Sequence, residues 1–297
     1  MAPLSCVLLI VLSSRSALKA TIIMFKLFIK LETLLAVIVM ALLTSCSSTS
    51  NTINECENDK NEDLLPGLFS ISENHQVRFS KGNLQYDKAN KTFQFAKNQF
   101  EIIGIGNRKI SSKENCLIDL FGWGTGDNPL LADTNDALYS RFVDWYRWGG
   151  KTKDENVTQW RTLSMDEWDY LLTERDSSDS KYGLGVVSGT FGIILLPDRF
   201  QMPEKLTFTN KTINLYSFSE WREMENAGAV FFPSGGYRVG TNVFDDGKYG
   251  YYWTSTSMEG NVMGINAYYV LLNPYNYYIG NHHRSCGFSV RLVQDTH

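Results

Sequence analysis

Apolar and polar residues alternate in several short segments of the chain. Residues 77–86 and 92–96 show this period of two, with a polar turn between them, which predicts a β-hairpin. Further along the chain, residues 119–126 place three glycines around Trp123, which indicates a buried loop. Short apolar and aromatic runs separated by turn residues predict further strands in the C-terminal half, at 229–232, 250–255, 267–272 and 288–293.

Two helices are predicted from capping signals and apolar spacing. Residues 164–175 begin with Ser164 and carry Glu167 three positions later, a capping box in which each side chain satisfies a backbone N–H. The apolar residues of this segment fall on one face, which predicts core packing for Met165, Trp168, Leu171 and Leu172. Residues 219–228 form the second helix, with Gly228 placed to end it. Few helices, many short strands and long loops predict an α+β domain.

A different apolar pattern lies near the N-terminus. A short basic segment from Met24 is followed by ten consecutive apolar residues at 34–43, which is typical of a secretory signal and too short to span a membrane. The sequence Leu-Thr-Ser-Cys that ends at Cys46 resembles the lipobox of bacterial lipoproteins, in which the cysteine is acylated. We therefore expect residues 1–46 to be a lipoprotein signal region with lipidation at Cys46. Because residues 1–23 precede a complete signal, we expect translation to begin at Met24.

The next segment, residues 47–64, is acidic and contains few apolar residues, so we expect a flexible tether in front of a single domain at 65–297. Without residues 1–46 the chain keeps 24 basic and 31 acidic side chains, a net charge of about −7. Such a chain lacks the basic footprint of a nucleic-acid binder. No aspartate follows Cys46 where inner-membrane retention would place it, and the acidic segment resembles surface-export signals. We therefore expect an outer-membrane protein at the cell surface.

A tract at residues 261–284 holds five Asn, five Tyr and two adjacent His. These side chains combine flat apolar faces with short hydrogen-bonding groups, the chemistry that antibody paratopes use. Asn and Tyr also accumulate in ordinary glycine-containing loops, so composition alone leaves both interpretations open. We interpret the tract as a recognition loop, with ligand contacts from Asn266, Tyr268, Tyr275, Asn276, Tyr278, Asn281, His282 and His283.

Seven segments of the chain together resemble the Fibrobacter succinogenes major paralogous domain family, a group of bacterial surface lipoproteins: residues 77–86, 120–124, 160–168, 194–198, 235–238, 250–255 and 287–293. This resemblance implies an α+β, C-type lectin-like fold with two helices, short antiparallel strands and long loops, related to formylglycine-generating-enzyme-type domains and to retroelement variable proteins. It also implies paired N- and C-terminal strands, with residues 77–82 beside 288–293. Within the resemblance, aromatic surroundings favour contacts with buried carbonyls or carboxylates, rather than with a ligand, for Arg161, Arg238 and Arg291.

The cysteines and histidines of the chain do not form the patterns expected of an enzyme. Formylglycine-generating enzymes use a pair of nearby cysteines with copper. After the expected lipidation of Cys46, this chain keeps Cys56, Cys116 and Cys286, and only Cys286 lies in the C-terminal region. Adjacent residues of a strand point to opposite faces, so His282 and His283 do not reach one metal ion together. His75 and His297 do not complete a ligand set, and no nucleophile motif is present.

The sequence thus predicts a cell-envelope lipoprotein that presents a ligand-binding face for a glycan, peptide or protein. No catalysis, cofactor or metal is expected. The main alternative is a structural adhesin or assembly subunit, and a divergent formylglycine-generating-enzyme-like enzyme is the third interpretation. The expected partners are an extracellular or envelope ligand and the membrane through the lipid anchor, with no nucleic acid.

Overall fold

The computed structural model describes residues 63–113, 117–145, 160–258, 265–273 and 277–296, all within the unit Lys60–His297. The expected signal region, its Cys46 and nearly all of the expected tether lie outside these ranges. Within them, no helix combines the length and the apolar character that crossing a membrane requires.

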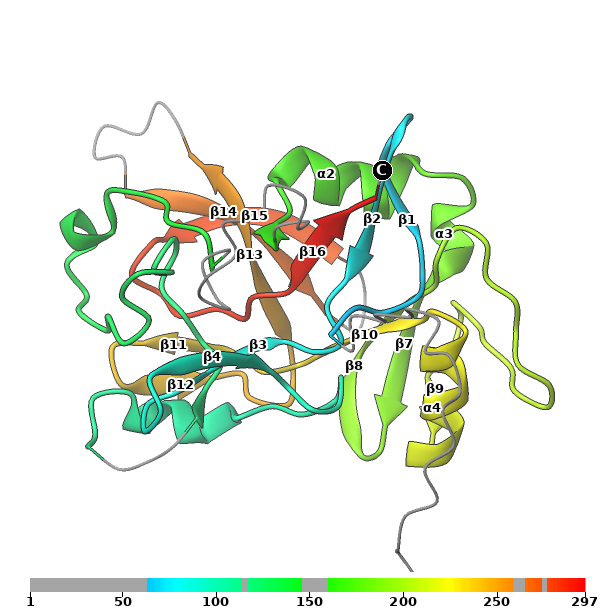
Figure 1. Cartoon of the computed structure of the whole chain (residues 1–297), viewed down its shortest axis with the longest axis horizontal. Helices are drawn as coiled ribbons and strands as arrows, with labels where there is room; N and C mark the ends of the chain where they lie inside the picture. Colours follow the sequence, from blue (N-terminus) through cyan, green and yellow to red (C-terminus); the bar gives the residue numbers. More distant parts are fainter. Residues whose placement is uncertain (1–62, 114–116, 146–159, 259–264, 274–276, 297) are drawn as a thin grey trace, which may run out of the picture. The chain divides into compact units, whose positions relative to one another are not determined.

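Strands dominate the described residues. They are β1 Phe69–Ser72, β2 His75–Phe79, β3 Leu84–Asp87, β4 Thr92–Phe95, β5 Leu117–Ile118, β6 Arg161–Thr162, β7 Tyr182–Val187, β8 Thr190–Leu195, β9 Asn214–Tyr216, β10 Val230–Pro233, β11 Tyr237–Val239, β12 Asn242–Phe244, β13 Gly250–Ser257, β14 Asn266–Leu272, β15 Tyr277–His283 and β16 Leu292–Asp295. They form five small sheets with the orders β1-β2-β16-β6, β10-β8-β7-β9, β11-β12, β13-β14-β15 and β4-β3-β5. Figure 1 shows these sheets and the few helical turns between them.

The helical segments are short: η1 Gly104–Lys109, η2 Asp136–Tyr139, α2 Met165–Asp169, the π-helical η4 Tyr170–Glu174, α3 Ser178–Lys181 and α4 Phe218–Asn226. The predicted capping box of Ser164 and Glu167 is confirmed at α2. At α4 the capping residue is Ser217, paired with Glu220, so the helix begins one residue earlier than predicted. Gly228 follows its end with φ +100°, as its position predicted.

The expectation of an α+β, C-type lectin-like domain is wrong. The described part of the chain is mostly β, with sixteen strands in five small sheets, and its longest α-helix, α4, has nine residues. The β7–β8 hairpin was missing from the predicted strands, because glycines interrupt the apolar pattern of both segments. The predicted helix at 164–175 is also broken, since α2 gives way to a π-helical turn after five residues.

Residues 77–86 do not form the single strand that their alternation predicts. β2 ends at Phe79 and β3 begins at Leu84, and a Cβ on the intervening Gly82 would lie only 2.4 Å from the carbonyl oxygen of Ala96. This close approach lets the chain bend between two sheets. The predicted hairpin exists in its second half, where β3 and β4 pair with Leu84 opposite Phe95.

The N-terminal strand β2 pairs with the last strand, β16. Phe79 lies opposite Val293 and Val77 opposite Asp295, so the pairing implied by the resemblance is present, although the register extends past residue 293 (Figure 1). Arg161 of β6 joins this sheet to α2. Its guanidinium donates to Asp295 Oδ1 at 2.7 Å and to Glu167 Oε1 at 2.8 Å.

Arg161 therefore binds carboxylates inside the fold, as expected. Arg238 has no exposed surface and donates to the carbonyl oxygens of Gly240 at 2.7 Å and Leu120 at 3.3 Å, which confirms its expected role. Arg291 donates to the buried carbonyl oxygen of Phe231 at 3.4 Å, as expected, and its shortest bond goes to the side-chain oxygen of Gln99 at 2.7 Å. Burial lowers the pKa of Arg291 to about 10.

The sheet β13-β14-β15 separates two apolar clusters. Because successive side chains of a strand point to opposite faces, Tyr252 and Val270 pack on the cluster that contains Phe79 and Trp168. Their neighbours Trp253 and Tyr269 pack on the cluster that contains Phe288, Trp123 and Trp145. Both faces of this sheet are therefore fixed by core packing, which holds the C-terminal hairpin in place.

Candidate functional site

The Asn/Tyr/His-rich tract is mostly a hairpin, not the loop that its composition predicts. β14 and β15 pair over seven positions without a register shift, from Asn266 opposite His283 to Leu272 opposite Tyr277. The predicted strand at 267–272 is confirmed as β14, whereas β15 was not predicted, because Asn281, His282 and His283 make its second half polar. Two of the predicted contact residues, Tyr275 and Asn276, lie outside the described residues.

Four of the predicted residues come together on one face of this hairpin. Asn266 lies opposite His283 and Tyr268 opposite Asn281, so their side chains share a face. The amide of Asn266 donates to Asn281 Oδ1 at 2.8 Å. Asn281 and His283 are exposed, whereas Asn266 and Tyr268 are half-buried. We call Asn266, Tyr268, Asn281 and His283 the polar cluster.

Tyr278 and His282 lie on the opposite face. Tyr278 is 57% exposed, and its ring covers Gly280, because a Cβ on Gly280 would lie 2.4 Å from Tyr278 Cε1. His282 instead points toward the core, with Nδ1 3.2 Å from Cys286 Sγ and its ring 5.8 Å from that of Phe288. The prediction that the two histidines face opposite ways is therefore confirmed.

Aromatic residues that the sequence analysis did not single out support the Tyr278 face. The rings of Tyr269 and Tyr251 stack at 5.8 Å, and those of Tyr237 and Phe244 at 5.2 Å. These rings cover one another's faces, so they mainly stabilise the sheet and leave Tyr278 as the exposed ring of the hairpin. The run of three aromatic residues from Tyr251 to Trp253, inside the predicted strand 250–255, was the signal that could have located Tyr251.

A cavity of about 440 Å³ opens beside the end of the hairpin. Arg284 follows β15, and its guanidinium lies 4.4 Å above the ring of Trp123, which lines the cavity. Its Nε donates to the carbonyl oxygen of Asn266 at 3.1 Å. Asp127 and Arg141 form an exposed ion pair of 2.6 Å at the cavity. The cavity therefore has charged and aromatic lining groups and lies next to Arg284 at the end of the hairpin.

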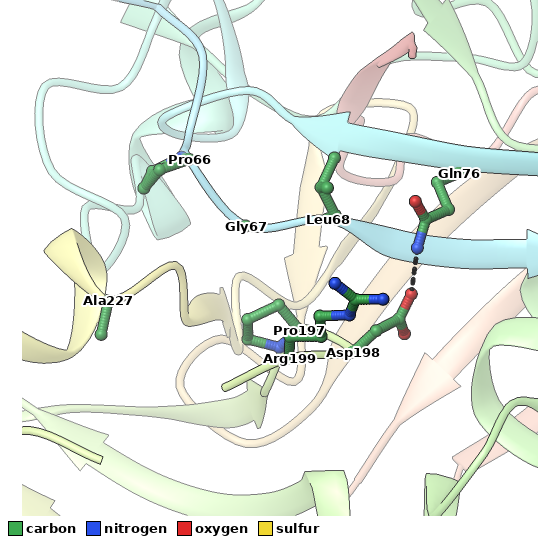
Figure 2. A pocket seen from close by; sticks show the side chains of 8 residues that line it. All are labelled: Pro66, Gly67, Leu68, Gln76, Pro197, Asp198, Arg199 and Ala227. Atoms are coloured by element: carbon green, nitrogen blue, oxygen red, sulfur yellow. Dashed lines mark hydrogen bonds between the residues drawn. The ribbon is translucent and has the colours of Figure 1, made fainter. Parts of the chain in front are cut away.

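A second cavity, of about 300 Å³, lies elsewhere in the fold and contains no residue of the tract (Figure 2). Figure 2 shows the carboxylate of Asp198 joined to the amide of Gln76, which donates at 2.8 Å. Ser70 donates to the same oxygen, and the buried Arg175 donates to the other at 3.2 Å. Burial acts to raise the pKa of Asp198, but these bonds outweigh it and lower the pKa. The carboxylate thus ties β1 and β2 to the segment after β8.

The polar cluster itself contains two amides, a phenol and an imidazole. Such groups donate and accept hydrogen bonds, and the ring of Tyr278 offers an apolar surface on the opposite face of the hairpin. Within the described ranges, the structure contains no group of three His, Cys, Asp or Glu side chains arranged to hold a metal ion. The polar cluster and Tyr278 therefore offer hydrogen bonding and ring stacking.

Comparison with known proteins adds one finding. No curated protein and no solved structure matches the chain. One family model matches a segment that begins four residues after β8 and ends within β16, so it includes the whole β14–β15 hairpin. The family model that matches it, over residues 199–293, is described as a domain of unknown function, DUF8237.

Proposed function

We propose that this chain is a lipid-anchored cell-envelope protein that binds a ligand through its β14–β15 hairpin, without catalysis. The observation that carries the proposal is the set of exposed side chains on β15, namely Tyr278 on one face and Asn281 and His283 on the other. Asn281 is held by Asn266, and Tyr278 rests on Gly280, so these groups are oriented before a ligand arrives.

A glycan is the ligand class that this surface fits best. An exposed tyrosine ring stacks on the apolar face of a sugar, and amides exchange hydrogen bonds with sugar hydroxyl groups. The charged pair Asp127 and Arg141 beside the hairpin offers further polar contacts to a longer chain. The surface requires no bound ion for such contacts.

Replacing Tyr278 or Asn281 with alanine should weaken glycan binding about tenfold, because each change removes a central contact of at least about 1.4 kcal/mol. The measurement is binding of the purified chain to an array of immobilised glycans, followed by titration of the best glycan. Leu215→Ala is the matched control, since Leu215 is 72% exposed on β9 and belongs to another sheet. Equal binding by all three variants and the unaltered chain would contradict the proposal.

The anchoring part of the proposal rests on the signal sequence and Cys46. Replacing Cys46 with serine should abolish incorporation of a labelled fatty acid and release the chain from the membrane fraction, because serine lacks the acceptor thiol. Cys286→Ser is the control and should keep the label, since Cys286 is buried in the fold. Continued labelling of the Cys46 variant would show that this cysteine is not the lipidation site.

The alternative, a structural adhesin or assembly subunit, is favoured by one specific observation. β15 is the outer strand of its sheet, and strands at a sheet edge can pair with another chain. A protein partner bound in fixed stoichiometry, together with failure on the glycan array, would favour this alternative.

A further inference from the structure

The two edges of the sheet β13-β14-β15 differ. The segment before β16 covers the outer side of β13. There the backbone N–H of Trp253 donates to Ser289 O at 3.1 Å, and the backbone N–H of Ser289 donates to Tyr251 O at 2.9 Å. The outer side of β15 pairs with no other strand among the described residues. One edge of the sheet is therefore closed and the other open.

The hydrogen-bond pattern shows which groups of β15 face outward. Thr254 Oγ1 donates to the carbonyl oxygen of Tyr268 at 2.9 Å, so the backbone groups of Tyr268 face β13. In an antiparallel ladder the residue opposite, Asn281, then directs its N–H and C=O away from β14, and so does Ile279 two positions before it. No hydrogen bond joins the outward backbone groups of Ile279 and Asn281 to another described residue.

β15 also lacks the features that protect an edge strand. Natural edges are kept short, bulged, or marked by lysine and proline. β15 has seven residues in unbroken register, Tyr-Tyr-Ile-Gly-Asn-His-His, without proline, lysine or a carboxylate. The other open sheet edges in the described ranges are strands of at most four residues, and β1 is bulged besides.

We infer that β15 pairs antiparallel with β15 of a second copy of this chain, about a two-fold axis at Gly280. Gly280 is the middle residue of the strand, so a two-fold axis there overlaps all seven residues. Ile279 then lies opposite Asn281 of the second copy, and the outward backbone groups of these two residues meet as donors and acceptors. The edges carry no lysine, arginine or carboxylate, so they meet without repulsion between fixed charges.

The side chains of the strand fit this register. At the axis two glycines face each other, which leaves room for the rings of Tyr278 that cover them. Tyr278 lies opposite His282 of the second copy, an aromatic pair of the kind that stabilises cross-strand contacts. At each end of the pairing, Tyr277 lies opposite His283 of the second copy. The backbone of His283 adds no hydrogen bond there, because its N–H already donates to His282 Nδ1 and its carbonyl accepts from Cys286. The pairing joins two three-stranded sheets into one and places two polar clusters side by side.

The test uses the full chain in detergent solution, with Ile279→Cys and Asn281→Cys prepared separately and then mixed in equal amounts. After mild oxidation of the mixture, mass spectrometry should detect a disulfide between Cys at 279 and Cys at 281 of another copy. This disulfide should be several times more abundant than the 279–279 or 281–281 disulfide that either variant forms when it is oxidised alone. Leu215→Cys, exposed on β9, sets the level of random collision, and the unaltered chain sets the contribution of the native cysteines. A 279–281 product no more abundant than the Leu215→Cys product would overturn the inference, as would a different dominant pair.

Sedimentation of Ile279→Pro gives an independent measurement. Proline removes the outward N–H of residue 279 and should convert the dimer of the unaltered chain to a monomer. Circular dichroism checks that the variant is folded, and if it is not, the disulfide experiment decides alone. If the unaltered chain itself sediments as a monomer and still binds on the glycan array, the pairing is overturned and the proposed function stands.

Discussion

Replacing Trp253 with alanine should lower the free energy of unfolding by about 3–5 kcal/mol, the range found for large aromatic residues removed from a core. Trp253 is 1% exposed, and its ring stacks on that of Phe288 at 4.2 Å. Its indole N–H donates to the carbonyl oxygen of Phe121 at 2.7 Å, a buried acceptor that alanine leaves without this donor. The change therefore opens a cavity and also removes a hydrogen bond.

The measurement is urea unfolding followed by circular dichroism, with ΔG extrapolated to water. Trp253→Phe is the graded control, because it keeps an aromatic ring beside Phe288 but loses the bond to Phe121. Its free energy of unfolding should lie between those of the unaltered chain and Trp253→Ala. A loss below about 1 kcal/mol for the alanine variant would mean that β13 does not need this contact.

Replacing Arg161 with methionine should cost about 2–4 kcal/mol at neutral pH, because it leaves the carboxylates of Glu167 and Asp295 facing each other without a cation. The three side chains are 23–30% exposed, so solvent screens part of the repulsion, and we place the loss slightly below the fully buried range. Glu167 also caps α2 through Ser164, so the variant should loosen this helix as well. Arg141→Met breaks the exposed pair with Asp127 and should cost less than about 1 kcal/mol.

The cost of the Arg161 change should depend on pH. Hydrogen bonds from Arg161 lower the pKa of Asp295, and the charges of Arg161 and His75 act in the same direction. A carboxyl group with a lowered pKa in the folded state contributes stability that is present above its unfolded pKa and is lost as the pH falls through the folded value. The difference between the unaltered chain and Arg161→Met should therefore be largest at neutral pH and shrink in acid. Unfolding curves at several pH values measure it, and a constant difference would contradict this account.

Local signals in the sequence predicted part of the fold correctly. The capping box of Ser164 and Glu167 places α2, and Gly228 ends α4, because both depend on neighbouring residues alone. The fold class depends on contacts between distant residues and was predicted wrongly. Gly82 illustrates the reason, since the alternation of residues 77–86 continues through the position where the chain bends and approaches Ala96 closely.

The site was predicted in its composition and only partly in its geometry. A period of two would have separated Tyr268 and Asn281 from Tyr278 and His282, but this requires knowing that residues 277–283 form a strand. The polar residues of β15 hide that strand. Support from Tyr251, and the cavity beside Arg284, depend on segments far away in the sequence, so no local pattern indicates them.

The pairing of β2 with β16 sets when the domain can fold. β2 is among the first strands to be synthesised, and β16 is the last. Contacts between such distant segments form slowly, because the long intervening chain must be ordered to bring them together. The sheet β1-β2-β16-β6 is therefore incomplete until residue 295 has been made. A chain that is still being synthesised therefore lacks β16, and loss of only the last few residues should leave the domain without its closing strand.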